Sequence, residues 1–252
     1  MFGLGKPKSG LDEEVEAFHV RTWEWLLDCG GGPKFLRDRP LVLPTPAFFP
    51  ATELEGHARA QYILKACQTY AGLADRPVKL IGQAELAGRV STLMSVQNPK
   101  HAAGTFSHSG NGGRITYDVG LLKQPVALVA TFAHELGHYF NDAFRFGHPD
   151  GEEAIEPATD TTATFLGFGV FGANSAFAFK RFQDFDAQGW SSSRLGYITE
   201  DEWAFDLAMF SALGGRDLEP ARQHLKPHIW NQTNRALKYL SASGVCKRIL
   251  GG

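Results

Sequence analysis

The sequence predicts an α+β protein in which a small, mostly antiparallel sheet packs on the helix over residues 124–140, with further helices flanking both. Short alternating segments joined by glycine-rich turns occur in the middle of the chain. Segments with helical periodicity lie before and after them. The chain has 252 residues, of which 43% are hydrophobic, so it can bury a substantial core. We find no linker and expect one domain over residues 1–252, with N- and C-terminal helical extensions.

The N-terminal part of the chain is predicted to be helical. An amphipathic helix is expected over residues 9–29, because apolar residues recur at helical spacing until Gly30 opens a run of three glycines. Residues 41–50 are too rich in proline for a central strand, and we expect them to cross the surface in extended form. A second helix is predicted over residues 52–71.

The strand signals come next. Residues 78–82 are predicted to form one strand, and residues 104–119 to form two strands around a glycine-rich turn. The segment Arg114–Gly120 lies directly before the next helix. If it has an exposed edge, it can pair with an extended peptide through main-chain hydrogen bonds. The alternative is a central strand that contributes only to the core.

Residues 124–140 are predicted to form a buried helix that contains the motif H-E-x-x-H. Pro125 falls in the first turn, where the missing N–H costs nothing. His134 and His138 are four residues apart, so both imidazoles point the same way and can bind one metal ion. Glu135 between them makes the site a catalytic proposal. The alternative is a pair of ordinary half-buried histidines beside a solvated glutamate.

A second acidic motif follows. Two histidines leave a tetrahedral zinc site one protein ligand short. Glu156 and Asp160 are one helical turn apart, and Pro157 is compatible with a first turn. We expect Glu156 to be the third ligand and Asp160 to accept a hydrogen bond from His134, which would fix its tautomer. The nearby acids Glu152 and Glu153, and Asp160 itself, remain alternative third ligands.

The spacing of these motifs selects among zinc enzymes. A metzincin would continue with glycine and histidine where this chain has Asn141 and Phe144, so that class is excluded. The chain instead resembles the gluzincin group of metallopeptidases, whose signature is H-E-x-x-H followed by E-x-x-x-D on a second helix. It is also similar to compact bacterial gluzincin-like proteins in which a short sheet precedes the active helix. The resemblance covers residues 114–174, and it implies a zincin-like fold and one Zn²⁺ per chain.

The remaining elements lie near the C-terminus. Residues 165–179 are short and glycine-rich for a membrane span, and we expect a buried helix followed by a turn. Thr199 and Glu202 form a capping-box pattern that opens a helix through Phe210. Another helix is predicted over residues 219–240, with a disturbance at Pro227.

The predicted chemistry is zinc-dependent peptide-bond hydrolysis. Zinc leaves a fourth position for water and lowers its pKa towards about 7. Glu135, which is not a ligand, would take the proton of this water and pass it to the departing amine. Tyr197, His148 and His108 flank the motifs and are candidate hydrogen-bond donors to the tetrahedral intermediate. The alternatives are a zinc hydrolase of a small amide and a catalytically silent regulatory or scaffold protein, against which Glu135 argues.

Composition excludes other classes. The formal net charge of −2 gives no reason to expect nucleic acid as a partner. The three cysteines, Cys29, Cys67 and Cys246, are odd in number and far apart, which favours free thiols and a reducing, cytoplasmic compartment. The first residues lack the apolar core of a secretory signal, and we expect no membrane span. The expected partner is an extended peptide or protein substrate.

Overall fold

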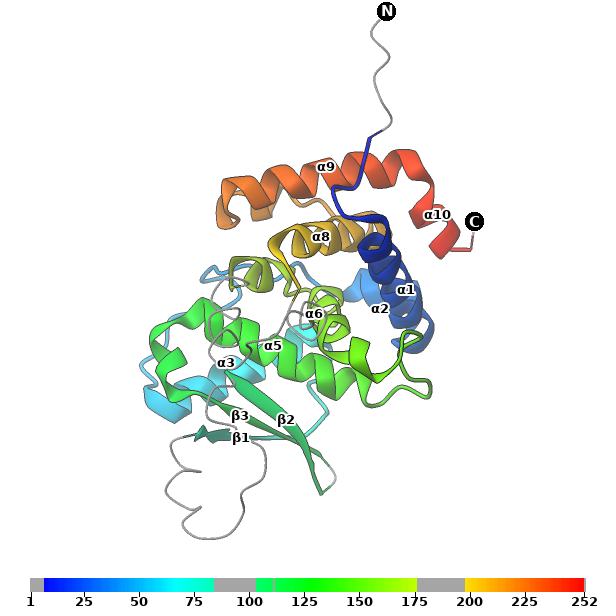
Figure 1. Ribbon diagram of the computed structural model, residues 1–252. Coiled ribbons are helices and arrows are strands. Elements are labelled where there is room, and N and C mark those ends of the chain that lie inside the picture. The colour runs from blue at the N-terminus through cyan, green and yellow to red at the C-terminus, as the bar shows by residue number, and fades with distance from the viewer. Residues whose placement is uncertain (1–6, 84–102, 111, 176–197, 252) are drawn as a thin grey trace, which may run out of the picture.

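The computed structural model describes residues 7–83, 103–110, 112–175 and 198–251. Helices form most of this part of the chain, and a three-stranded sheet lies below helix α5 in Figure 1. The strands are β1 (Val78–Gly82), β2 (Gly104–Ser109) and β3 (Gly112–Tyr117). The α-helices are α1 (Glu13–Cys29), α2 (Gly32–Asp38), α3 (Gly56–Ala71), α5 (Pro125–Asn141), α6 (Ile155–Phe165), α8 (Glu200–Gly214), α9 (Pro227–Ser243) and α10 (Val245–Ile249). Three short 3-10 helices are η1 (Val119–Lys123), η2 (Glu152–Ala154) and η3 (Glu219–His224).

The sheet is mixed, with the strand order β1-β3-β2. β2 and β3 pair antiparallel across the glycine-rich turn, with Gly104 opposite Tyr117. β1 and β3 pair parallel, with Val78 opposite Gly113. The prediction of a mostly antiparallel sheet was therefore wrong for one of its two pairings. Parallel partners need a long crossover connection, and here residues 83–111, which include β2, supply it.

Of the two alternatives for the segment Arg114–Gly120, an exposed strand edge and a central strand, the structure shows the central strand. Its first four residues belong to β3, which lies between the other two strands, and Ile115 and Tyr117 are buried. Its last two residues already belong to η1. Within the described sheet β2 is instead an outer strand, and it packs on α5. The Phe106 ring lies 5.2 Å from the Tyr139 ring across this contact.

Helix α5 forms the centre of the fold because almost every side chain on it is buried. Its alanine-, leucine- and valine-rich sequence presents apolar groups on all sides, and Phe132 and Leu136 are fully enclosed. α5 packs on β2, α3 and α6, while α8 and α9 lie beyond α6 (Figure 1). Pro125 occupies its first turn, as predicted. The H-E-x-x-H motif is thus held in a rigid, buried helix.

The N-terminal predictions need two corrections. α1 begins at Glu13 rather than at residue 9, because Asp12 with its extended backbone is the N-cap. It ends before Gly30, as predicted. The glycine run is followed directly by α2, a helix that was not predicted and that has a proline in its first turn. Residues 41–50 form neither helix nor strand.

The C-terminal helices are interrupted where glycine and proline require it. The predicted helix over residues 219–240 is two elements, η3 and α9, because Pro227 cannot continue a helix and instead starts α9. For residues 165–179 we expected a helix followed by a turn, but the turn comes first. Gly167 adopts φ 101° next to the backbone of Pro40, and residues 169–175 are helical after it. Residues 176–179 lie outside the described part of the chain.

Two smaller predictions are confirmed, the capping box of α8 and the free cysteines. The capping box of α8 is present, since the Thr199 hydroxyl accepts from the Glu202 backbone N–H and the Glu202 carboxylate accepts from the Thr199 N–H. The three cysteines form no disulfide. Among the described helices, none has the length and apolar character that crossing a membrane requires.

Candidate metal centre

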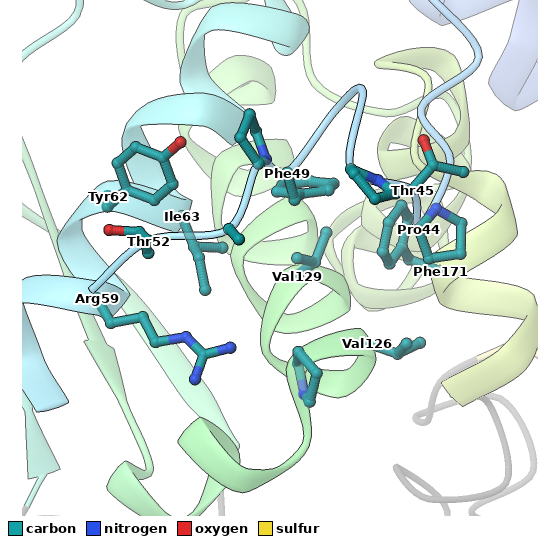
Figure 2. Close-up of a pocket in the computed structure, with 14 residues that line it drawn as sticks. Pro44, Thr45, Phe49, Thr52, Arg59, Tyr62, Ile63, Val126, Val129 and Phe171 are labelled. Carbon is teal, nitrogen blue, oxygen red and sulfur yellow. The ribbon is translucent and has the colours of Figure 1, made fainter. Parts of the chain in front are cut away.

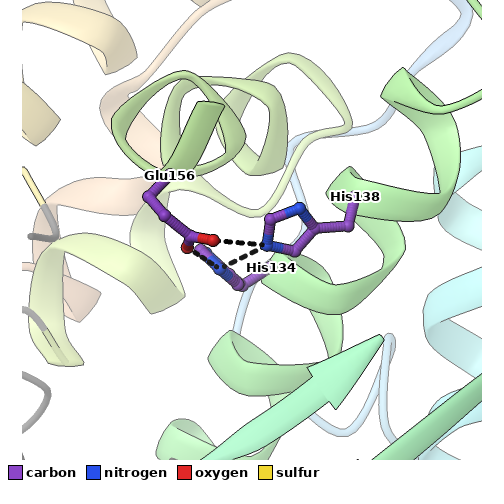
Figure 3. A group of neighbouring side chains, drawn as sticks. All are labelled: His134, His138 and Glu156. Carbon is purple, nitrogen blue, oxygen red and sulfur yellow. Dashed lines mark hydrogen bonds and ion pairs between the residues drawn. The ribbon is translucent and has the colours of Figure 1, made fainter. Parts of the chain in front are cut away.

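Two helices bring the predicted ligands together. α5 presents His134 and His138 one turn apart, and the first turn of α6 presents Glu156 opposite them (Figure 3). The two Nε2 atoms are 3.1 Å apart. The Glu156 carboxylate lies 3.3 Å from Nε2 of His134 and 3.6 Å from Nε2 of His138. Three ligand atoms therefore surround one point.

The spacing of these atoms fits a zinc ion. Tetrahedral zinc binds nitrogen and oxygen at about 2.0–2.1 Å, which places neighbouring ligand atoms about 3.3 Å apart. The two Nε2 atoms are 3.1 Å apart, and the contacts of Glu156, from Oε2 to His134 and from Oε1 to His138, are 3.3 and 3.6 Å, so the distances lie around that value. Within the described ranges, these three residues form the group of histidine and acidic side chains with metal-ligand spacing.

The outer ring nitrogens have acceptors, which fixes the tautomers. Nδ1 of His134 lies 2.8 Å from Oδ1 of Asp160. Nδ1 of His138 lies 3.4 Å from the Thr159 hydroxyl, which donates its own proton to the carbonyl of Ile155. Each ring can thus keep a proton on Nδ1 and present the lone pair of Nε2 to a metal ion at the shared point. Two lone pairs at this distance repel each other unless a cation lies between them, which is the chemistry of a metal site.

The charges of the cluster are strongly coupled. Hydrogen bonds from His134 and His138 hold the pKa of Glu156 well below its usual range, although burial opposes them. Burial alone would lower the pKa of His134, but its hydrogen bonds to Asp160 and Glu156 outweigh this effect and raise the pKa well above its ordinary value. The carboxylates therefore attract a positive charge to this point. A metal ion would replace the proton there.

Asp160 lies behind His134 rather than in the ligand cluster. Its carboxylate is fully buried, and burial raises its pKa although the contact with His134 lowers it. Oδ1 faces Nδ1 of His134, and Oδ2 accepts a hydrogen bond from the backbone N–H of Ile198 at 3.1 Å. This is the position predicted for a residue that orients a ligand histidine.

The other acids that were considered as the third ligand lie at different positions from Glu156. Glu152 and Glu153 lie in η2, and both are exposed. Of the four acids that the sequence left as possible third ligands, Glu156 is the one whose oxygen atoms reach the space between the two histidines.

Glu135 lies on the sheet side of α5 and is buried, with 4% of its surface exposed. A Cβ atom on Gly104, at the start of β2, would lie 3.0 Å from its Oε1. Burial raises the pKa of Glu135, while the positive charges on His134 and His138 partly oppose this effect. Its carboxylate has no hydrogen-bond partner among the residues that the structure describes. Buried polar groups nearly always have a partner, so water or substrate is a candidate partner for this carboxylate.

The three candidate donors have other surroundings. His148 uses both ring nitrogens within the protein, one with the Thr22 hydroxyl at 2.9 Å and one with the backbone N–H of Asp150 at 3.1 Å. His108 is exposed on β2 and contacts Asp142, just beyond the end of α5. Neither is in contact with the three ligands. Tyr197 lies outside the described residues.

Two participants were missed by the sequence analysis. Thr159, which receives the proton of His138, lies three residues after Glu156 on α6, and helical spacing could have identified it. The backbone N–H of Ile198 leaves no signal in a sequence, because every residue except proline has this group. Its position depends on where α8 begins.

A separate cavity of about 350 Å³ lies between residues 44–52, α3 and the first half of α5 (Figure 2). Its walls are mostly apolar, and α5 contributes Val126 and Val129. None of His134, His138 and Glu156 is among the residues that line this cavity. The cavity is therefore not part of the metal centre.

No protein-family model, curated protein or solved structure matches this chain. Its function must be argued from the chemistry of the site. The residues present fit a zinc ion by donor type, by spacing and by tautomer.

Proposed function

We propose that the protein is a zinc-dependent peptidase of the gluzincin type, in which His134, His138 and Glu156 hold one ion. The observation that carries this proposal is the cluster of His134, His138 and Glu156 beside the buried carboxylate of Glu135, for which the described residues offer no hydrogen-bond partner. A site kept only for structure would have no use for that carboxylate.

The proposed mechanism assigns the proton transfers to Glu135. A bound zinc ion supplies a Lewis acid and lowers the pKa of water. Glu135 accepts a proton as the water attacks the peptide carbonyl, and then gives this proton to the departing amine. Its raised pKa suits both steps, because a group that titrates nearer to neutrality can accept and release a proton. Asp160 keeps the Nδ1 proton of His134 in place throughout.

The proposed substrate is an extended peptide that binds along β2. This strand begins beside Glu135 at Gly104, and its other end approaches Asp142, where His108 lies. In the described part of the sheet, β2 pairs with β3 on one side only. A peptide added to the other side would form main-chain hydrogen bonds and run past Glu135. β2 thus takes the role that the sequence analysis gave to Arg114–Gly120.

A closed structural zinc site is the less favoured reading. Structural sites hold zinc with four protein ligands, whereas catalytic sites leave one position open. The described residues supply a group of three. In a structural site, removal of one zinc ligand would disturb the fold. In a catalytic site, the buried core around α5 would remain folded after the same change.

The test combines metal analysis with hydrolysis. Protein purified without added metal should contain about one zinc per chain and should cleave members of a peptide library. Glu135→Gln should keep the zinc and lose hydrolysis, because the amide cannot accept the proton. Glu152→Gln, which removes an exposed acid nearby, is the control and should behave like the wild type. Activity of Glu135→Gln within a few-fold of the wild type would contradict the proposal.

A further inference from the structure

A second polar cluster lies behind the metal centre, around the imidazole of His19 on α1. This side chain is fully buried. Its Nδ1 lies 2.9 Å from Oδ1 of Asp206, and its Nε2 lies 3.2 Å from Oε1 of Glu202, both on α8. Because each ring nitrogen faces a carboxylate, both carry a proton and the ring is cationic. Burial alone would lower the pKa of His19, but the two carboxylates raise it to about 9.

Asp206 connects this cation to the helix that carries Glu156 and Asp160. Its carboxylate is fully buried. Oδ2 accepts a hydrogen bond from the hydroxyl of Thr161 at 2.8 Å, and Oδ1 accepts one from the indole N–H of Trp23 at 2.8 Å. Thr161 directly follows Asp160 on α6. We call His19, Glu202, Asp206 and Thr161 the His19 network.

Glu202 connects the His19 cation to the hydrogen-bond donor of the second Asp160 oxygen, Oδ2. While Oε1 contacts His19, Oε2 accepts hydrogen bonds from the backbone N–H and the hydroxyl of Thr199. The residue before Thr199 is Ile198, whose N–H donates to Oδ2 of Asp160. The position of this N–H thus depends on how Glu202 holds the start of α8.

The His19 network therefore reaches Asp160 from two directions. Through Asp206 it fixes the backbone of α6 next to Asp160, and through Glu202 it fixes the donor that orients the Asp160 carboxylate. Replacing buried ion pairs by apolar residues is often neutral or favourable for stability, so a gain in net stability does not by itself explain the buried pair of His19 and Asp206. Directional hydrogen bonds do supply a fixed relative orientation of α1, α6 and α8, which apolar contacts do not.

We propose that His19 is a positioning residue of the metal centre, which acts through Glu202 and Asp206 to hold the Asp160 carboxylate against Nδ1 of His134. This inference rests on the proposed function, because it requires that His134 binds the metal. His19 itself touches neither the ligands nor the substrate. Its effect should therefore appear in the zinc affinity, and only while Asp160 is present.

The test is a double-mutant cycle on zinc affinity in the full-length protein. The variants are His19→Gln, Asp160→Asn and the combination of both, and Zn²⁺ is titrated in competition with a chelator of known affinity. We expect His19→Gln to weaken zinc binding about tenfold, which is at the lower end of what direct partners of ligand histidines contribute. In the Asp160→Asn background the same substitution should change the affinity less than about twofold, because its route of action is gone.

Two further variants separate positioning from stability. Leu240→Ala removes a buried side chain of α9 that belongs to no hydrogen bond of the network. It should lower the melting temperature without weakening zinc binding. Glu202→Gln keeps an oxygen acceptor for Thr199 but loses the charge that faces His19. If His19→Gln does not fold, Glu202→Gln takes its place in the double-mutant cycle.

The outcomes are distinct. An affinity of His19→Gln, or of its substitute, within about twofold of the wild type would overturn the inference. The inference would also be overturned if the losses of zinc affinity in His19→Gln and Asp160→Asn multiply fully in the double variant, because the two residues would then act independently. An equal loss of zinc affinity in Leu240→Ala would mean that the effect of His19→Gln comes from lower stability in general. This result would also overturn the inference. Absence of zinc binding in the wild type would instead contradict the proposed function, and this inference with it.

Discussion

Nδ1 of His134 lies 2.8 Å from Oδ1 of Asp160, and this contact joins the two helices that carry the metal-binding motifs. His134 is on α5 and Asp160 is on α6, 26 positions apart in the chain. The carboxylate keeps the proton of the imidazole on its outer nitrogen, so the inner nitrogen offers its lone pair. The same contact makes the ring more basic and therefore a stronger ligand.

Asp160→Asn should weaken zinc binding by about 10- to 100-fold and leave the protein folded. The amide can still contact His134, but it no longer supplies the negative charge that strengthens the ligand. Competition with a chelator measures the affinity, and circular dichroism measures the fold. A loss as complete as that caused by His138→Ala would instead make Asp160 a ligand.

Glu156→Gln should reduce zinc affinity far more than Glu153→Gln, although the two acids are three residues apart. Both acids are exposed, but Glu156 contacts both histidines, whereas Glu153 in η2 does not belong to this cluster. The amide oxygen is a much weaker zinc ligand than the carboxylate. Isothermal titration with Zn²⁺ compares the two variants directly. Equal affinities would exclude Glu156 as the third ligand.

The grouping of the candidate ligands could be predicted because it depends on local periodicity. His134 and His138 lie on one face of any helix that contains them, and Glu156 lies one turn from Asp160 for the same reason. The boundaries of β1 and of α5 were also predicted closely, since Pro125 and the alternating strand pattern are local signals.

The remaining features depend on contacts between distant segments. The parallel pairing of β1 with β3 follows from how the chain crosses between them, which no local pattern encodes. His19 lies 187 positions before Asp206, and as a single histidine in an amphipathic helix it is indistinguishable from a core residue. Ile198 acts through its backbone, so only the folded arrangement identifies it.

His148 should make the protein less stable in mild acid. Its Nδ1 accepts a hydrogen bond from the Asp150 N–H, so the ring must stay neutral, and burial lowers its pKa to about 4. The unfolded chain takes up a proton near pH 6.5. The free energy of unfolding should therefore fall as the pH decreases from about 6.5 to 4. The slope should correspond to the uptake of up to about one proton on unfolding.

Urea denaturation across this pH range measures the effect. His148→Gln should flatten this part of the curve relative to the wild type. His228→Gln, at an exposed position of α9, should leave the slope unchanged. An unaltered slope in His148→Gln would assign the acid sensitivity to other groups.

Peptide cleavage should depend on main-chain hydrogen bonds if the substrate pairs with β2. Proline has no N–H, so a proline placed within the extended stretch removes one donor without adding charge. We expect prolines at alternate positions on one side of the scissile bond to abolish cleavage of a good substrate peptide. Those at the intervening positions, whose N–H groups point away from the strand, should have less effect. Unchanged cleavage throughout the proline scan would exclude strand addition.

Gly104→Ala should reduce hydrolysis about 10- to 100-fold while zinc affinity stays within about twofold of the wild type. A Cβ at this position would lie 3.0 Å from Oε1 of Glu135 and 2.7 Å from Cγ2 of Thr131, so the carboxylate must move to make room. None of the three ligands is in that contact. Gly113→Ala is the matched control, because its Cβ would crowd the Phe106 ring at 2.8 Å on the same pair of strands. Both variants should lose stability, and rates per folded molecule should fall only in Gly104→Ala. An equal fall in both would mean that the sheet as a whole, and not the position of Glu135, limits hydrolysis.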